Sequence, residues 1–279
     1  MNIEEFKSKI FSENTSEVYS ALNFIEENPV NDFGEILVQK LQQEKNIFII
    51  VKILEIVAKI KNAEIIKKVF YIFRDNDDNY IKATLVKILT NFSEKEFVNY
   101  IKECLYHKDS RVRANAVEVC EKSNMKEFIP VLVNLLKDSN SRVKINAARA
   151  LYYFGDKRML RVFEKLLDTN DTYIQESVVH TLYVINNNES YEILKRFFLK
   201  TKNERLLLKL LDIFGYIGKE DLLPEIRKLS INFNKKIAEL AEYAMSGIIS
   251  RKEPGVKCGK CGAVNNSISK FCGSCGNKI

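Results

Sequence analysis

A segment of seven residues recurs along the chain at intervals of 31. Residues 111–117 (RVRANAV) return as residues 142–148 (RVKINAA), and a weaker copy occupies residues 173–179 (YIQESVV). The same register marks eight apolar anchor positions at intervals of 31 or 32: Val18, Ile49, Ile81, Val112, Val143, Ile174, Leu206 and Ile237. Because one unit of this length cannot bury a core of its own, the period predicts stacked copies of a small motif.

Two helices fit within each repeat. The residue four positions after each anchor is apolar in all eight copies, and the residue eight positions after is apolar in all but the first, where Glu26 stands. Such positions share one face of a helix. A second apolar series predicts a preceding helix in every repeat: Phe6, Leu37, Val69, Ile101, Leu132, Phe163, Leu194 and Ile226. The first 250 residues hold only five Gly and three Pro, which is typical of nearly continuous helix.

Short polar segments separate these helices. Residues 75–79, 107–110, 137–141 and 168–172 are rich in Asp, Asn and Ser, which can cap the helix that follows. Pro130 and Pro224 lie near the start of the first helix of their repeats, where the missing N–H costs no helical hydrogen bond. We therefore predict an all-α fold, an α-solenoid of about eight helix pairs over residues 1–249.

The pattern of residues 132–151, LxxLLKDSNSRVKINAARAL, resembles the HEAT repeat in the short form found in many bacterial proteins. The resemblance covers about residues 1–249. It implies an Asp in the turn and a basic residue early in the second helix that bond within and between repeats. Asp138 and Lys144 match these positions. Arg113 matches the basic position, but His107 stands where its Asp would be. We therefore expect the series of bonds between these Asp and basic residues to be incomplete.

The chain changes character after about residue 250. Five of its ten Gly and four of its six Cys fall in the last 29 residues, and residues 250–257 have the composition of a polar linker. The cysteines are arranged as C-x2-C, ten residues, and C-x2-C: Cys258, Cys261, Cys272 and Cys275. Four thiolates at this spacing can close a tetrahedral zinc site.

Residues 258–279 therefore predict a zinc ribbon, and they are similar to the short zinc-ribbon modules of many bacterial and archaeal proteins. We expect one structural Zn²⁺ with no open coordination position. A module this small cannot fold on apolar burial alone, so the metal should supply its folding energy. A redox dithiol or a disulfide pair is the alternative use of these cysteines.

The remaining chemistry-bearing residues form no catalytic motif. Cys104 and Cys120 fall on the apolar registers, so we expect packed core thiols. His107 lies in a turn and His180 on the polar side of its helix. We find no His-Glu pair like that of HEAT-like di-iron hydroxylases, no Gly-rich phosphate loop and no nucleophile elbow. Bilin lyases contain short HEAT-like repeats, which this chain resembles in repeat type alone. We therefore expect that the chain is not an enzyme.

The net charge of +7 is distributed as a gradient. Residues 1–50 carry a net charge of −5, whereas residues 251–279 carry +5. Charges of both signs alternate on the polar side of the second helices, so they form no continuous basic track for nucleic acid. An acidic partner should therefore be sought at the basic C-terminal end.

The leading hypothesis is a non-enzymatic scaffold or adaptor that binds protein partners through the solenoid surface, with the zinc ribbon as an accessory contact. The alternative is nucleic-acid binding through the basic C-terminal repeats and ribbon, and a HEAT-like lyase is a third hypothesis. Residues 1–10 lack the apolar core of a signal peptide, and no apolar run is long enough for a transmembrane helix. Few cysteines outside the predicted zinc site favour a reducing, cytoplasmic location.

Overall fold

The computed structural model describes residues 1–29, 31–90, 92, 94–251, 256–257 and 264–265. These residues form sixteen α-helices, three short 3₁₀ helices and two short strands. They divide into two compact units, Met1–Met159 and Leu160–Ile279. The helical repeat continues through both units, so the prediction of an all-α solenoid of helix pairs is confirmed.

The first unit contains five helix pairs. They are α1 (Ile3–Ile10) and α2 (Thr15–Glu27), α3 (Gly34–Gln43) and α4 (Ile47–Ile60), α5 (Ala63–Phe73) and α6 (Asn79–Ile88), α7 (Lys95–Cys104) and α8 (Ser110–Lys122), and α9 (Ile129–Leu135) and α10 (Ser141–Tyr153). Two 3₁₀ turns, Asn31–Phe33 and Lys126–Phe128, lead into α3 and α9.

The second unit contains three further helix pairs. They are α11 (Met159–Leu167), which begins at the boundary, and α12 (Thr172–Ile185), α13 (Asn188–Lys200) and α14 (Glu204–Ile217), and α15 (Leu223–Asn232) and α16 (Lys235–Ser250). A 3₁₀ turn at Glu220–Leu222 precedes α15. Beyond α16, β1 (Val256–Lys257) pairs antiparallel with β2 (Val264–Asn265), with Val256 opposite Asn265.

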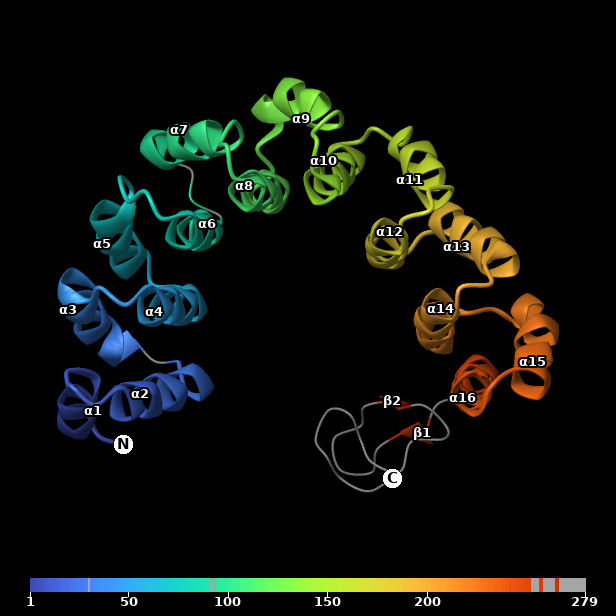
Figure 1. Cartoon of the computed structure of the whole chain (residues 1–279), viewed down its shortest axis with the longest axis horizontal. Coiled ribbons are helices and arrows are strands. Elements are labelled where there is room, and N and C mark those ends of the chain that lie inside the picture. The colour runs from blue at the N-terminus through green and yellow to red at the C-terminus, as the bar shows by residue number, and fades with distance from the viewer. Residues whose placement is uncertain (30, 91, 93, 252–255, 258–263, 266–279) are drawn as a thin grey trace. The chain divides into compact units, whose positions relative to one another are not determined.

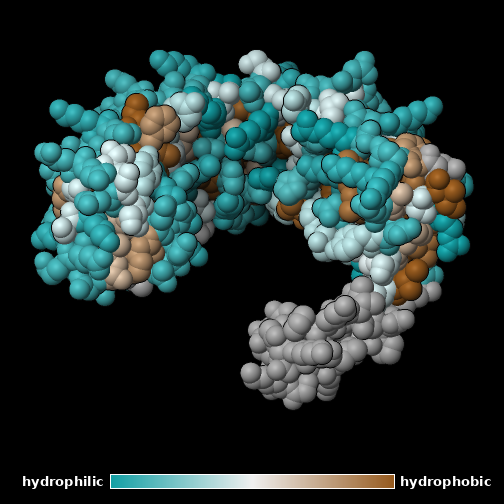
Figure 2. Space-filling model, turned by 60° about the horizontal axis from the view of Figure 1, so that its bottom comes forward, coloured by the Kyte–Doolittle hydropathy of each residue, from teal (hydrophilic) through white to brown (hydrophobic). Residues whose placement is uncertain are grey.

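Within each unit the helices form two layers, one of first helices and one of second helices (Figure 1). Successive second helices pack against one another, as α6 does on α8 and α14 on α16. The face of the molecule seen in Figure 2 is mostly hydrophilic, with hydrophobic surface confined to small areas. The core of each unit therefore lies between its two layers.

Both apolar registers of the sequence lie in this core. Every residue of the first-helix series, from Phe6 to Ile226, has an exposed fraction of 0%. On the second helices seven of the eight anchors are buried, and Ile174, in the first helix pair of the second unit, is half-buried. Cys104 and Cys120 are buried and unbridged, which confirms their prediction as core thiols.

The polar turns cap the second helices as predicted. Asp78, Asp109, Asn140 and Asp171 each precede a second helix, and their side-chain oxygens accept N–H groups of its first turn. Pro130 and Pro224 lie in the first turns of α9 and α15. No helix in the described part of the chain is both long enough and apolar enough to cross a lipid bilayer.

Candidate binding surface on the second helices

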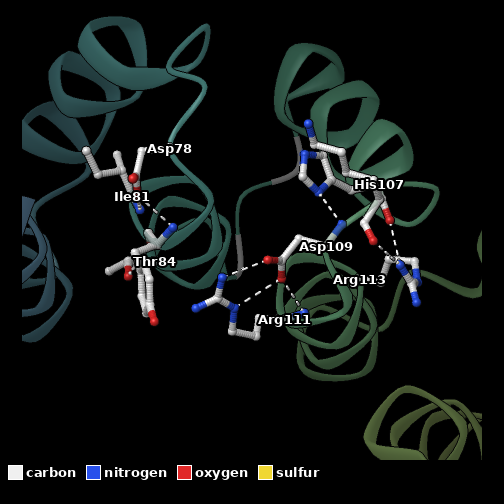
Figure 3. Close-up of polar contacts among 9 residues, drawn as sticks. Asp78, Ile81, Thr84, His107, Asp109, Arg111 and Arg113 are labelled. Atoms are coloured by element: carbon white, nitrogen blue, oxygen red, sulfur yellow. Dashed lines mark hydrogen bonds and ion pairs between the residues drawn. The ribbon is translucent and has the colours of Figure 1, made fainter. Parts of the chain in front are cut away.

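His107 and Asp138 occupy equivalent positions in two successive turns, and each holds its turn with a side-chain acceptor. Asp138 Oδ1 accepts the N–H of Asn140 at 2.8 Å. His107 Nδ1 accepts the N–H of Asp109 at 3.0 Å (Figure 3). The imidazole therefore replaces the carboxylate as acceptor, but it brings no negative charge to the turn.

Arg113 joins the fourth repeat to the fifth. Its Nε and Nη2 donate to the two carboxylate oxygens of Asp138, both at 2.8 Å, and Nη1 donates to the carbonyls of His107 and Lys108 at 2.7 and 2.9 Å. Burial opposes ionisation of Asp138, but the hydrogen bonds from Arg113 and the Asn140 N–H outweigh it and lower the pKa of the carboxyl group. The ionic partner of Asp138 is thus the basic residue of the preceding repeat.

Two buried asparagines connect three successive second helices. Asn115 Nδ2 donates to the carbonyl of Ala83 on α6 at 2.8 Å. Asn146 Nδ2 donates to the carbonyl of Ala114 on α8 at 3.1 Å. Both side chains are more than 90% buried, and they are 31 residues apart. We did not assign them a role from sequence, although Asn at the same place in two copies of the repeat was the available signal.

The residue immediately before each anchor forms what we call the first-turn row. From the second repeat onward this row reads Phe48, Tyr80, Arg111, Arg142, Tyr173, Arg205 and Lys236. Its aromatic members are strongly exposed: 77% for Phe48, 59% for Tyr80 and 70% for Tyr173. This row was not predicted from sequence, because the repeat is defined by its apolar positions. Its signal is a column that holds only aromatic and cationic residues from the second repeat onward.

An arginine of the first-turn row stacks on the tyrosine of the preceding repeat in both units. The guanidinium carbon of Arg111 lies 3.9 Å from the Tyr80 ring centroid, and that of Arg205 lies 4.9 Å from the Tyr173 ring centroid. The same arrangement therefore occurs twice, on independent helices.

A carboxylate fixes each stacked arginine. Asp109 accepts from Nε and Nη2 of Arg111 at 3.1 and 2.7 Å (Figure 3), and these hydrogen bonds lower the pKa of Asp109 to about 2. Glu176 pairs with Arg205 in the same way, and its Oε2 lies 2.7 Å from Nη2. At these two places the row thus presents stacked planar groups whose charge is already matched.

A polar cavity of about 310 Å³ lies beside the turn that holds His107. It is lined by Arg74, Asp75, Asp77, Lys82, Tyr100, Glu103, Cys104 and His107. Burial raises the pKa of the Cys104 thiol to about 12, and burial together with Lys82 lowers the pKa of His107. At neutral pH the cavity therefore holds a neutral imidazole and a protonated thiol.

The four cysteines predicted to bind zinc, Cys258, Cys261, Cys272 and Cys275, lie outside the described residues. Within the described ranges no group of three or more His, Cys, Asp or Glu side chains is arranged to hold a metal ion. The zinc site therefore stays a prediction from the cysteine spacing.

Several solved structures are similar to this chain at low sequence identity. The complex of CpcE and CpcF of phycocyanin lyase from Nostoc sp. PCC7120 is 15% identical, with a TM-score of 0.58 over 89% of this chain and 95% of the other. YibA of Escherichia coli is 18% identical, with a TM-score of 0.50 over 89% and 93%. Human deoxyhypusine hydroxylase in complex with glycerol is 11% identical, with a TM-score of 0.40 over 88% and 95%.

The prediction from sequence that the chain is not an enzyme is wrong, because it was based on repeats that also occur in an enzyme complex. It rests on a HEAT-like solenoid without a familiar catalytic motif, yet the same fold is found in the phycocyanin lyase complex. The absence of known motifs therefore does not exclude catalysis on this architecture.

No curated protein matches this sequence. The family of HEAT repeats matches residues 66–144 and 129–212, which together span more than half of the chain. This stretch contains the Arg113–Asp138 bond and both buried asparagines. With its repeated helix pairs and its buried registers, the chain belongs to the HEAT-repeat family.

Proposed function

We propose that this chain is a scaffold that binds protein partners through its solenoid surface, with the members of the first-turn row within each unit as principal contacts. The observation that carries this proposal is the exposure of Phe48, Tyr80 and Tyr173 in one register, with an arginine of the same register stacked on each tyrosine. Aromatic and arginine side chains are the groups that contribute most to protein–protein interfaces.

The way the row is fixed supports a binding role. Arg111 and Arg205 are each held between a tyrosine ring and a carboxylate, so little side-chain freedom is left to lose when a partner docks. The related fold from Nostoc was solved as a complex of CpcE and CpcF, so a protein is a ligand that this architecture accepts.

The matched charges also distinguish a protein partner from a nucleic acid. A nucleic-acid track needs cations that are free to contact phosphates. In the row itself Arg111 pairs with Asp109 and Arg205 pairs with Glu176, whereas Arg142 and Lys236 form no ion pair with a described residue. We therefore expect binding at the two stacked arginines to depend weakly on salt, and steep salt dependence with an RNA or DNA probe would favour the nucleic-acid alternative instead.

Site-specific photo-crosslinking tests the proposal. A photoreactive amino acid at Phe48, Tyr80 or Tyr173 should form one discrete protein adduct in cells, whereas the same group at Tyr106, which is 64% exposed but outside the row, should not. Tyr80→Ser and Tyr173→Ser should then weaken binding of the crosslinked protein in purified form. Equal adducts at Tyr106, or unchanged affinity in both serine variants, would contradict a contact through the row.

A lyase subunit is a second candidate function, favoured by the fold shared with the phycocyanin lyase complex. If the chain supports such a reaction, a purified mixture with its crosslinked partner should attach bilin covalently to phycocyanin, and omission of this chain should abolish the product. Absorbance of the protein-bound pigment after denaturation would measure it.

We further propose that Cys258, Cys261, Cys272 and Cys275 hold one structural zinc ion. Four thiolates suit Zn²⁺, and the antiparallel pairing of β1 with β2 supports the proposal because Cys258 and Cys261 fall between these strands. The purified full-length chain should contain one zinc per molecule by elemental analysis, and Cys258→Ser with Cys261→Ser should lose it while the helical circular dichroism is kept. A metal-free chain with a disulfide would support the redox alternative.

A further inference from the structure

The polar cavity beside the turn of His107 lies wholly within the first unit. Its volume of about 310 Å³ is in the range of pockets that hold small molecules. Five of its lining residues are buried or half-buried: Arg74, Lys82, Tyr100, Cys104 and His107. The other three are exposed carboxylates: Asp75, Asp77 and Glu103. The cavity therefore has an inner side of mostly basic and neutral polar groups and an acidic rim.

The next repeat has a carboxylate at the place where this cavity lies. Asp138 stands at the position equivalent to His107, and it accepts two hydrogen bonds from Arg113, 25 residues before it, both at 2.8 Å. Lys82 stands 25 residues before His107, at the position equivalent to Arg113, and it forms no ion pair with a described residue. Burial and, after it, the charge of Lys82 lower the pKa of His107, so the ammonium group lies near this turn. Because Lys82 and His107 both line the cavity, it marks a cation whose carboxylate is missing.

Two neutral donors on the inner side also lack a partner. His107 Nδ1 accepts the N–H of Asp109 (Figure 3), so the proton of the neutral imidazole is on Nε2, which has no hydrogen bond to a described residue. Tyr100 is only 9% exposed, and its hydroxyl oxygen is enclosed without a hydrogen bond in the described part of the chain. Burial and the neighbouring Cys104 thiol raise the pKa of Tyr100, so its hydroxyl keeps the proton. Buried polar groups are normally hydrogen-bonded, so a cation and two unused donors together indicate a ligand with a carboxylate.

The acidic rim distinguishes a simple anion from a zwitterion. Arg74 is already paired with Glu96 and, at 3.6 Å, with Asp75. Asp77 and Glu103 form no ion pair within the described ranges, so their charges are uncompensated at the mouth of the cavity. Two such carboxylates repel a phosphate or a dicarboxylate, but they attract an ammonium group. A free amino acid carries both a carboxylate and an ammonium group and has no net charge, so it fits the inner side and the rim together.

We propose that this cavity binds a free amino acid, whose carboxylate compensates for the one that is missing at His107. That carboxylate accepts from Lys82 Nζ, Tyr100 Oη and His107 Nε2. The ammonium group faces Asp77 and Glu103. The inference goes beyond the proposed function, and its assay contains no protein partner, so failure of either proposal leaves the other standing.

Isothermal titration calorimetry of the full-length chain tests the ligand class. The probes are the standard amino acids together with glycine, β-alanine and γ-aminobutyrate, a series in which the two charges move apart. For each ligand that binds, the deaminated and the decarboxylated analogues and inorganic phosphate are the controls. We expect at least one amino acid to bind, and all three controls to bind clearly more weakly. Absence of binding by every amino acid at millimolar concentration, or equal binding of a control, would overturn the proposal.

Variants with matched controls locate the site. Lys82→Met should weaken binding about tenfold or more, because a hydrogen bond between two charged groups is lost, whereas Lys87→Met, on the same helix but outside the cavity, should not. Tyr100→Phe should weaken binding without lowering the thermal midpoint of the free chain, since its hydroxyl has no hydrogen bond to lose. Tyr106→Phe, at a residue that is 64% exposed, is its control. Equal affinities within either pair would refute the assignment.

His107→Asp is the sharpest variant, because the chain itself then supplies the missing carboxylate. It should abolish binding of the amino acid while the free chain stays at least as stable as before. His107→Asn keeps an acceptor for the Asp109 N–H and an N–H donor without the charge, so it should retain measurable binding. Unchanged affinity in His107→Asp would show that the carboxylate of the ligand does not occupy this place.

Discussion

The two units join successive second helices by different means. In the first unit the contacts are polar: Asn115 and Asn146 each donate to a carbonyl of the preceding second helix, and Arg113 bonds to Asp138 of the next repeat. In the second unit α14 and α16 meet at Gly215 and Gly247, and a Cβ atom added to Gly247 would lie 2.3 Å from the Gly215 carbonyl oxygen.

This difference shows that one repeat length permits two kinds of helix contact. A side-chain bridge requires a buried polar group with a partner, which the asparagine amide supplies. A contact between glycines requires that no atom be added, because backbone cannot move aside as a side chain can. We therefore expect a contact of the first kind to lose stability when a hydrogen bond is removed. A contact of the second kind should lose stability when a methyl group is added.

Gly247→Ala should have the largest effect on stability. Alanine ordinarily favours a helix over glycine, but here its methyl group meets backbone, and we expect a loss of about 3 kcal/mol in the free energy of unfolding of the second unit. Urea denaturation followed by circular dichroism measures the loss. Ser246→Ala, at the exposed neighbouring position, should be nearly neutral, and a stabilised Gly247→Ala protein would show that α14 and α16 are not in backbone contact.

Arg113→Met should destabilise the first unit by about 2 kcal/mol at pH 7, because it leaves the buried carboxylate of Asp138 without its partner. Arg142→Met, at an exposed position, is the matched control.

The pH dependence of this loss gives a further check. The pKa of Asp138 is lowered in the folded state, so its stabilisation is present above the ordinary value near 3.9 and is lost as the pH falls through the lowered folded value. The difference between Arg113→Met and the unchanged chain should therefore be constant from about pH 5 to 8 and shrink below about pH 4. A difference that grows in acid would mean that the pair does not stabilise the fold.

Asn146→Ala should cost about 1 kcal/mol, the usual net value of a single hydrogen bond. Asn115→Ala should cost less, because Asn115 Oδ1 is buried without a hydrogen bond and its removal relieves part of the loss. Asn134→Ala on the exposed side of α9 serves as the control in the same urea titrations. A larger loss of stability in Asn115→Ala than in Asn146→Ala would indicate that Asn115 Oδ1 has a partner in solution.

His107→Asp should have the smallest effect, a gain of about 0.5 kcal/mol at pH 7. The new carboxylate could accept the Asp109 N–H as Asp138 accepts that of Asn140, and it would stand 25 residues after Lys82, the spacing of Arg113 and Asp138. His107→Asn keeps an acceptor without the charge and should not show the gain. If both variants lose stability equally, the imidazole makes contacts in its cavity that neither replacement supplies.

Much of the fold was predictable from sequence, because burial of a helix face imposes a period on apolar residues. The fully buried series from Phe6 to Ile226 and the caps at Asp78 and Asp109 were predicted from spacing and residue type. The partner of Asp138 was not, since several basic residues compete and only packing selects Arg113. The first-turn row was overlooked for a related reason: exposed positions are not constrained by burial, so their pattern has to be sought column by column.

Arg251 follows the last helix. Its guanidinium group donates to the carbonyl of Gly215, within the last turn of α14, and to that of Gly218, just beyond this helix, the latter at 2.6 Å. The chain therefore leaves the solenoid from a fixed point. Six residues separate Arg251 from Cys258, and an extended chain of that length spans at most about 25 Å. A partner docked on the second unit would thus encounter the proposed zinc ribbon at a high effective concentration, so even a weak contact there would add substantially to its residence time.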